Sequence, residues 1–564
     1  MSRETQFDAI VIGSGITGGW AAKELTELGL RTLVLERGAA IEHGRDYKNE
    51  MKAPWELPQH GFGNARLWAE RYGVQQRNGH FDEWNQDYWV DDIDNPYVAP
   101  RPFNWFRGYH LGGRSLMWGR QSYRWSDLDF GANARDGHGS DWPIRYADLA
   151  PWYERVEDFI GVSGQAENYG SLPDGHFQPA MALNVVEAHV KQSIEAHFPG
   201  RILTIGRTAN LTVAKPEQGR AACQNRSICT RGCSYGAYFS TQSSTLPAAR
   251  ATGKLTLITD ALVEGIDSDA QTRRATGVRV LDTRTRKRSR YTARVIFLCA
   301  GSFNSVGLLL RSANAAHPNG LANSSGVLGR YLMDHATTVG VAALVPGFEQ
   351  RTYHGNRPTG VIVPRFVNTG ADSAARPFLR GYSFQGGAYR AGWTRGLAQP
   401  GLGVSYKAGL RGPGDWKFVL TSFVECLPRA ENRLTLEPNK VDRHGVPQFR
   451  IEFGFGDNEQ QALADARTEA AAMLKAAGAR VLFGSDQPNP GGSAIHEMGG
   501  ARMGRDPATS VLGAHNQAHD LPNLFVTDGA AMASSACQNP SLTYMALTAR
   551  AAHAAADQLR SGVL

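Results

Sequence analysis

The chain has 564 residues, with a hydrophobic content of 42% and a charged content of 20%, which suits a soluble globular protein with more than one hydrophobic core. Its 60 basic and 53 acidic residues give a formal net charge of +7 and are interspersed, so a nucleic-acid-binding tail is not indicated. No apolar run reaches the ~20 residues of a membrane helix, and six cysteines do not indicate a disulfide scaffold.

The N-terminal stretch predicts a strand, a tight turn, a helix and a second strand. Apolar runs at residues 9–12 and 33–35 flank three glycines, Gly13, Gly15 and Gly18. Gly13 permits the turn, Gly15 lets the backbone approach a pyrophosphate, and Gly18 lets the helix pack closely on the strand.

The start of this helix predicts where a diphosphate would bind. The backbone N–H groups of Ile16 and Thr17 lie at the positive end of the helix dipole. Glu36 ends the second strand, where a carboxylate can accept hydrogen bonds from a ribose 2′-OH. The flanking strands, the helix and the terminal acid all match the order of a dinucleotide-binding motif, which favours a dinucleotide site over a chance glycine-rich turn.

Residues 40–105 are rich in Trp, Tyr, Pro and charge without a period, and we expect an irregular excursion that caps a site. The segment that follows, RGYHLGGRSLMWGRQSYRW, contains Gly112 and Gly113, which could form an ordinary turn. Together with the N-terminal motif, it resembles the flavin-contacting loop of the glucose–methanol–choline (GMC) oxidoreductases. The resemblance implies contacts from Ser115 and Met117 to FAD.

Met117 stands where some sugar oxidases of the GMC family carry a histidine tethered to the flavin. A thioether cannot form that bond in the same way, so we expect non-covalent FAD. The next segment, residues 141–164, resembles a helix of the family, and Asp148 is a plausible N-cap for it.

Three cysteines, Cys223, Cys229 and Cys233, follow at a C-x5-C-x3-C spacing. Scattered structural thiols and a disulfide with one odd cysteine are alternatives, and zinc would need a fourth ligand. Thiolates on a glycine-containing loop suit iron, and three ligands favour a three-iron form. The spacing also resembles the 3Fe-4S loop of FAD-dependent sugar dehydrogenases in the GMC family, so we expect a one-electron relay here.

Strand patterns resume at residue 255, and a run at residues 295–300 precedes Gly301 in a second strand-to-glycine turn. Val263 falls where the family's adenine-contacting strand would lie, although a plain core valine is equally compatible. The basic cluster at residues 284–290 is expected to be a solvated hairpin tip. His335 follows an apolar turn and is expected to be a structural core histidine.

Residues 345–490 contain alternating aromatic stretches that predict an antiparallel sheet, and residues 458–477 predict an Ala/Glu-rich helix. We expect this region to bind substrate, with the sheet covering the flavin. In the C-terminal segment, residues 524–527 predict a strand followed by a turn at Asp528 and Gly529.

A long Ala-rich helix is predicted to open at Asn539-Pro540-Ser541-Leu542-Thr543. The pattern H-x-x-G-x-x-R-M-G followed by N-P-x-L-T closely resembles the C-terminal motif of GMC sugar oxidoreductases. The resemblance makes His496 the catalytic histidine and Asn539 its hydrogen-bonding partner. It places FAD contacts at the following residues: Asp528, Gly529, Asn539, Pro540, Leu542 and Thr543.

The expected fold class is α/β with an α+β substrate part: a Rossmann-like FAD-binding domain and a discontinuous antiparallel-sheet domain. The FAD-binding domain is assigned residues 1–45, 105–135, 220–340 and 490–564. The substrate-binding or cap domain is assigned residues 46–104, 136–219 and 341–489, and the loop from Cys223 to Cys233 is the candidate iron–sulfur segment.

The resemblance implies oxidation of a sugar secondary alcohol. The Trp-rich excursion also suits a carbohydrate, because aromatic faces pack on sugar C–H surfaces. A neutral imidazole with an ordinary pKa of ~6.5 can take the hydroxyl proton near neutral pH, while the Asn539 amide orients the C–H bond toward flavin N5. The loops look most like those of glucoside 3-dehydrogenases, which make 3-keto sugars. Alternatives are glucose 1-dehydrogenase or gluconate dehydrogenase, a pyranose-oxidase-like enzyme that produces H₂O₂, and a non-catalytic FAD-binding partner.

We expect no membrane span, no nucleic-acid partner and a sugar or glucoside substrate. No charged-then-apolar leader and no twin-arginine pair precede the first strand, so the chain is expected to carry no export signal of its own. Export would then need a small subunit that bears a Tat signal, with a cytochrome c as electron acceptor. The expected location is the periplasm, and the cytoplasm is the alternative.

Overall fold

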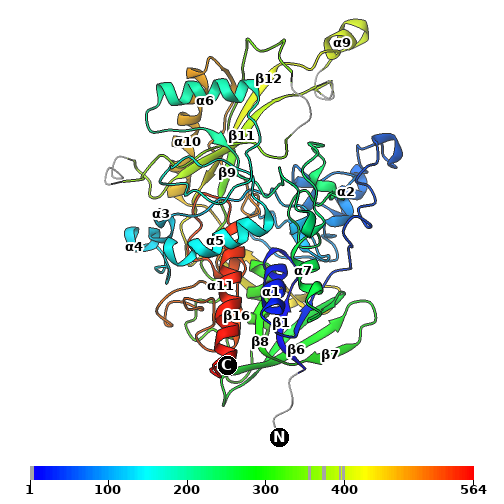
Figure 1. The fold of residues 1–564 in the computed structure, drawn as a ribbon, viewed down its shortest axis with the longest axis vertical. Helices are drawn as coiled ribbons and strands as arrows, with labels where there is room; N and C mark the ends of the chain where they lie inside the picture. The colour runs from blue at the N-terminus through cyan, green and yellow to red at the C-terminus, as the bar shows by residue number, and fades with distance from the viewer. Residues whose placement is uncertain (1–5, 353–356, 371–375, 393–394, 397–399) are drawn as a thin grey trace.

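The computed structural model describes the chain except for residues 1–5, 353–356, 371–375, 393–394 and 397–399. Two large sheets organise it, one in each half of the molecule as drawn in Figure 1. The first is a parallel sheet of five strands in the order β16-β8-β1-β2-β4. Its strands are β1 (Phe7–Ile12), β2 (Thr32–Leu35), β4 (Leu255–Ile258), β8 (Ala293–Leu298) and β16 (Leu524–Val526).

The predicted strand–turn–helix–strand unit at the N-terminus is confirmed as β1, α1 (Ile16–Glu27) and β2. A Cβ on Gly18 would lie 1.9 Å from the carbonyl oxygen of Gly13, so only glycine allows this close approach of helix and turn. Helix α1 packs against α7 (Thr245–Ala251) and against the C-terminal helix α11 (Ser541–Arg560). The two ends of the chain therefore lie side by side, blue against red in Figure 1.

Helix α5 (Tyr146–Ile160) packs on α11 and corrects one prediction. The N-cap is Arg145, not Asp148, which occupies the third helical position. The Asp148 carboxylate accepts a hydrogen bond from the Arg145 backbone N–H at 2.8 Å. The acid therefore reaches back from inside the first turn, where its charge also complements the helix dipole.

The second sheet has six strands in the order β15-β9-β12-β11-β10-β3, all paired antiparallel. This confirms the predicted antiparallel sheet, which begins at residue 336 rather than 345 and recruits a short strand from residues 204–205. Its strands are β3 (Thr204–Ile205), β9 (Ala336–Leu344), β10 (Val361–Val363), β11 (Tyr382–Arg390), β12 (Trp416–Val424) and β15 (Arg480–Phe483).

Helices α6 (Val185–His197) and α10 (Asp457–Ala476) pack against this sheet, and α10 confirms the helix predicted over residues 458–477. Alternate side chains of β12 are buried, among them Trp416, Phe418 and Leu420. Full burial of one such large apolar side chain stabilises the fold by roughly 1.5–3 kcal/mol. This alternation is what fixes the register of the strand.

Smaller elements complete the fold. The predicted hairpin tip near residues 284–290 is confirmed: residues 283–287 connect β6 (Arg274–Asp282) to β7 (Arg288–Tyr291), and Arg288 and Arg290 on β7 pair with Glu264 and Asp267. Residues 40–105 are irregular, as predicted, with short helical turns and α2 (Ala65–Arg71). The remaining elements are α3 (Asp127–Phe130), α4 (Ala132–Asp136), α8 (Ser302–Arg311), α9 (Gly403–Leu410), β5 (Ala261–Asp269), β6 (Arg274–Asp282), β7 (Arg288–Tyr291), β13 (Arg433–Val441) and β14 (Pro447–Glu452).

The predicted fold class is confirmed: a Rossmann-like parallel sheet combined with antiparallel sheets. The residue boundaries of the two predicted domains stay a prediction. Among the helices of the described residues, none combines the length and the apolarity needed to span a membrane.

Candidate active site

A cavity of about 550 Å³ extends from the carboxyl edge of the parallel sheet to the antiparallel sheet. Strands β1, β2, β8 and β16 each end at its wall, which is the edge where open α/β sheets bind ligands. Strands β11 and β12 contribute Gln385 and Phe423 from the opposite side. The volume lies within the usual range of small-molecule and cofactor sites.

The glycine-rich turn forms an open cradle in this cavity. Gly13 has φ +95°, a backbone conformation that favours glycine. A Cβ on Gly15 would meet no other atom within 4 Å, so the backbone is uncovered on that side. No side chain caps the N-terminus of α1, which leaves its first N–H groups available to an anion. The cradle therefore fits the pyrophosphate of the expected FAD.

Glu36 lies beside this cradle and is 6% exposed. Its carboxylate accepts hydrogen bonds from the Ser14 backbone N–H at 3.1 Å, the Ser14 hydroxyl at 2.6 Å and the Gly38 N–H at 2.9 Å. Burial raises the pKa of this carboxyl, and the hydrogen bonds oppose the shift. These bonds hold the acid at the cavity wall, where the sequence predicted a ribose contact.

The Gly112–Met117 segment is joined to the cradle. The Gly112 N–H donates to the Ser14 hydroxyl at 2.8 Å, and the Ser115 hydroxyl donates to the Gly112 carbonyl at 2.7 Å. Gly112 has φ +83°, and a Cβ there would lie 2.3 Å from the Gln242 side chain. One hydrogen-bonded chain thus links Glu36, Ser14 and Gly112 around the proposed cofactor position.

The structure brings together most of the residues that the sequence singled out for FAD. The following line the cavity: Gly13, Gly15, Ile16, Thr17, Glu36, Gly113, Ser115, Met117, Val263, Asp528, Gly529, Asn539 and Pro540. Four others lie behind its wall: Gly18, Gly112, Leu542 and Thr543. Thr543, for example, is fully buried with its hydroxyl 2.8 Å from that of Tyr153, so its environment is that of a packing residue.

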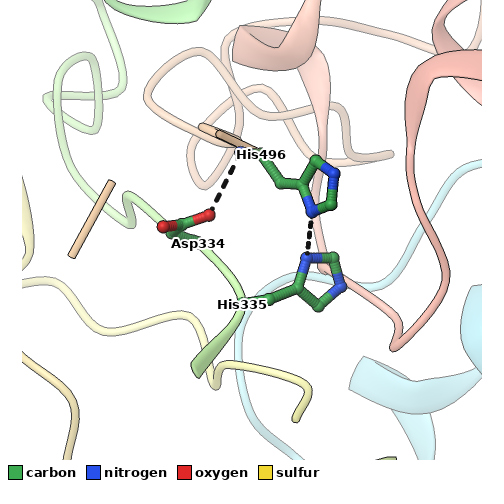
Figure 2. A group of neighbouring side chains, drawn as sticks. All are labelled: Asp334, His335 and His496. Carbon is green, nitrogen blue, oxygen red and sulfur yellow. Dashed lines mark hydrogen bonds between the residues drawn. The ribbon is translucent and has the colours of Figure 1, made fainter. Parts of the chain in front are cut away.

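His496 and Asn539 lie together at one end of the cavity. The Asn539 Nδ2 atom is 3.1 Å from His496 Nε2, and Gln385 Nε2 donates to Asn539 Oδ1 at 2.6 Å. The other imidazole nitrogen, Nδ1, lies 2.8 Å from Nδ1 of His335 (Figure 2). Burial, then the neighbouring His335 and Arg114, lower the pKa of His496 well below its usual value, so the ring is neutral at pH 7.

The backbone that carries His496 is strained. Ile495 has φ +64°, which is rare for a β-branched residue. The Asp334 carboxylate accepts hydrogen bonds from the backbone N–H groups of Gly492, at 2.7 Å, and of His496, at 3.2 Å (Figure 2). Burial and the nearby Glu497 raise the pKa of Asp334 to about 7. Asp334 therefore holds the turn that directs His496 into the cavity.

The three cysteines lie outside the cavity, as half-buried free thiols. Within the described part of the chain, their sulfur atoms are not all within 4.8 Å of one another, a spacing that a single ion would need. Arg226 Nη2 lies 3.6 Å from the Cys233 sulfur. Arg220 also acts electrostatically on Cys233, and its buried Nη2 has no hydrogen-bond partner among the described residues. Arg226 already pairs with Glu50 at 2.6 Å, so it is the Arg220 guanidinium that fits an added negative charge at Cys233.

Two tyrosines connect the cysteine loop to the cavity wall. The Tyr88 hydroxyl donates to the Arg231 carbonyl at 3.2 Å, and Gly232 lies against the Tyr47 ring. Both tyrosines pack with Leu116, and Met117 joins the same cluster. Because Met117 lines the cavity, only a thin layer of side chains separates the loop from it.

Sequence reasoning missed several residues of this site. His335 was expected to be a structural core residue; it is buried, at 1% exposed, but it contacts His496. Gln385 lies on β11 and Phe423 on β12, and the sequence pattern of neither strand marks these positions as cavity-lining. Asp334 gave no signal beyond its position next to His335.

Comparison with known proteins gives a consistent result. The family model described as GMC oxidoreductase matches residues 7–337 with its N-terminal part and residues 428–548 with its C-terminal part. The chain is 29% identical to a 2-methyl-1,2-propanediol dehydrogenase of Mycolicibacterium austroafricanum, over 97% of this chain and 94% of the relative. It is 26% identical to a fructose dehydrogenase large subunit of Gluconobacter japonicus over all of both chains.

The fold is similar to that of solved structures. A pyridoxine 4-oxidase from Mesorbium loti aligns with a TM-score of 0.61 at 16% identity, over 97% of this chain and 98% of the other. At that identity the similarity concerns the fold alone.

Proposed function

Because the chain belongs to the GMC oxidoreductase family, whose members bind FAD, we propose that it is an FAD-dependent dehydrogenase that oxidises a secondary alcohol of a sugar or glucoside. The observation that carries this proposal is the pair of His496 Nε2 and Asn539 Nδ2, 3.1 Å apart at the end of the cavity that begins at the glycine cradle. FAD, when bound, supplies the hydride acceptor for the alcohol carbon.

His496 acts as the general base. A substrate hydroxyl that replaces the hydrogen bond between Asn539 Nδ2 and His496 Nε2 donates its hydrogen to His496 Nε2 and accepts a hydrogen bond from the Asn539 amide. The lowered pKa of His496 keeps its nitrogen free to receive the proton at neutral pH. Gln385 holds the Asn539 amide in this orientation by occupying its oxygen. Fixing the hydroxyl and the base in one geometry removes much of the entropic barrier.

We propose a sugar substrate because both polar and aromatic groups line the cavity. Gln385, Gln121 and Asn539 offer hydrogen bonds, and Phe423 and Trp118 offer flat apolar faces. The fructose dehydrogenase relative supports a sugar, and the loops favour glucoside C3. The diol dehydrogenase relative favours a second candidate, a small vicinal diol.

We further propose that Cys223, Cys229 and Cys233 hold a 3Fe-4S cluster, which when bound would carry single electrons from the flavin site to an external acceptor. The Arg220 guanidinium, whose buried Nη2 has no hydrogen-bond partner among the described residues, and the short path through Tyr47 and Tyr88 support it.

A protein electron acceptor and a second subunit suit this arrangement. The fructose dehydrogenase relative is named as a large subunit. In this chain Met51, which contacts Arg226 of the cysteine loop, is 72% exposed, and Tyr235 is 44% exposed. We propose that a cytochrome c accepts the electrons and that a small Tat-signal-bearing subunit takes the enzyme to the periplasm.

The test is anaerobic reduction of the bound flavin, followed by NMR of the product. Methyl glucoside, glucose, gluconate, fructose and 2-methyl-1,2-propanediol are offered in turn. The proposal expects fast bleaching of the flavin band with a glucoside and a 3-keto product. Fast bleaching by the diol alone would favour the second candidate, H₂O₂ formation in air would favour an oxidase, and bleaching by none of them would contradict the proposal.

A further inference from the structure

His335 contacts the proposed base through an unusual pair of like nitrogens. Its Nδ1 lies 2.8 Å from Nδ1 of His496, and the two rings are almost perpendicular, at 83°, with centroids 4.9 Å apart (Figure 2). A hydrogen bond at this distance requires that one nitrogen carries the proton and the other presents its lone pair. The neighbouring hydrogen bonds determine which of the two Nδ1 atoms carries the proton.

The orientation of the Asn539 amide determines which ring nitrogen of His496 carries the proton. Gln385 Nε2 donates to Asn539 Oδ1, so the Asn539 group that faces His496 Nε2 is its NH₂ group. An NH₂ group can only donate, so His496 Nε2 must accept and carries no proton. A neutral imidazole has one N–H, and in His496 it is therefore on Nδ1, from which it donates to His335 Nδ1.

His335 is suited to remain an acceptor. Burial lowers the pKa of His335 to about 4, and the backbone of Ala536 acts in the opposite direction. The Phe423 ring lies beside both imidazoles, with centroids 6.0 Å from His335 and 6.1 Å from His496. A ring that stays neutral, in an apolar setting, keeps its Nδ1 lone pair directed at His496.

From this geometry we infer that His335 is a positioning residue that fixes the tautomer of His496, so that the basic lone pair is always on Nε2, facing the substrate. The inference rests on the proposed function for its catalytic consequence. When the substrate hydroxyl transfers its proton to His496 Nε2, the bond from Nδ1–H to His335 becomes charge-assisted and stabilises the cation. No proton passes to His335, and the proton remains on His496 until product leaves.

The charged and titratable groups around the pair are few. Asp334 directly precedes His335 in the chain, and Glu497 pairs with Arg114 at 2.7 Å on the cavity side. Tyr544 approaches the same Glu497 from α11. Asp334 accepts a hydrogen bond from the His496 backbone and not from its ring, and Arg114 donates to Glu497. His335 is therefore the residue that contacts His496 Nδ1.

The test compares two variants that differ in one acceptor. In His335→Asn the amide oxygen can accept from His496 Nδ1–H, whereas in His335→Leu nothing can. We expect His335→Leu to lower kcat at least about tenfold with little change in KM, and His335→Asn to recover most of that loss. Equal activity of the leucine variant and the unsubstituted enzyme, or equal impairment of both variants, would overturn the inference.

A second measurement is independent of turnover. In protein labelled with ¹⁵N-histidine, the ring pattern of His496, assigned by its loss in His496→Gln, should show Nδ1–H and a bare Nε2. In His335→Leu the same ring should average between its two tautomers. An Nε2–H tautomer in the unsubstituted protein would refute the inference even if every alcohol is oxidised as proposed, and failure to oxidise any alcohol would refute the proposed function while leaving this measurement valid.

Discussion

The proton acceptor at residue 496 is the smallest unit on which the proposed chemistry depends. His496→Ala removes the proposed base but leaves the cradle intact, so kcat should fall by about 10²- to 10⁴-fold while the flavin remains bound. Steady-state kinetics and the flavin absorbance measure the two effects. His138→Ala, which changes an exposed histidine outside the cavity, should leave both unchanged. A His496→Ala enzyme with ordinary kcat would point to another base or to a non-catalytic role.

Asn539 should contribute through one hydrogen bond to the reacting oxygen. Asn539→Ala removes the donor, and the loss of such a donor typically costs about 10²-fold in kcat. Asn539→Asp keeps the shape but presents no N–H, so it should be similarly impaired. Rates close to those of the unsubstituted enzyme in both variants would show that the amide does not hold the hydroxyl.

The pH profile follows from the environment of His496. The base works only when it is neutral, and burial lowers its pKa well below the usual value. kcat/KM for the alcohol should therefore stay level as the pH falls from 8 through ~6.5, the ordinary histidine pKa, and decline only in more acidic solution. Anaerobic flavin reduction across buffers of constant ionic strength measures this. Half-maximal activity at or above the ordinary value would contradict the assignment.

At the scale of elements, substitutions at two glycines of the β1–α1 turn should affect FAD binding and protein stability separately. Gly15→Ala adds a methyl group where no protein atom lies within 4 Å, so the chain should fold normally and bind FAD more weakly. Gly18→Ala places the same group 1.9 Å from the Gly13 carbonyl, and overpacking of this kind costs typically 1–3 kcal/mol. Thermal unfolding and FAD titration distinguish the two. Gly170→Ala, with open space around it, is the control. Unimpaired FAD affinity in Gly15→Ala would remove the cradle from the cofactor site.

Elements with a strong local pattern were predictable from the sequence, whereas contacts between distant elements were not. The β1–α1–β2 unit, the helix at α10 and the strand before Asp528 follow from periodicity and glycine spacing. Asp148 was misplaced because an acid inside the first turn and an acid at the cap look alike in a sequence. Gln385 and His335 could not be placed, because their roles arise from the packing of β11 and the 334–335 segment onto the 492–496 turn.

At the scale of the whole molecule, the cysteine loop and the flavin site should be separable. If the loop holds a 3Fe-4S cluster, Cys229→Ser should lose the iron, the brown colour and most of the turnover with a one-electron acceptor. Flavin reduction by substrate should continue, because the cavity lies beyond the tyrosine layer. Cys426→Ala, a buried cysteine outside the loop, is the control. Absence of iron from the unsubstituted protein after anaerobic purification would eliminate the cluster.

The pairing of α1 with α11 has a consequence for biosynthesis. During translation the glycine cradle leaves the ribosome long before the edge strand β16, the proposed base and the helix that covers α1. A growing polypeptide must therefore keep the apolar surface of β1 and α1 protected until those later elements have been made. Cofactor loading becomes a post-translational event, and a message truncated before codon 524 should yield a product that neither retains flavin nor resists proteolysis.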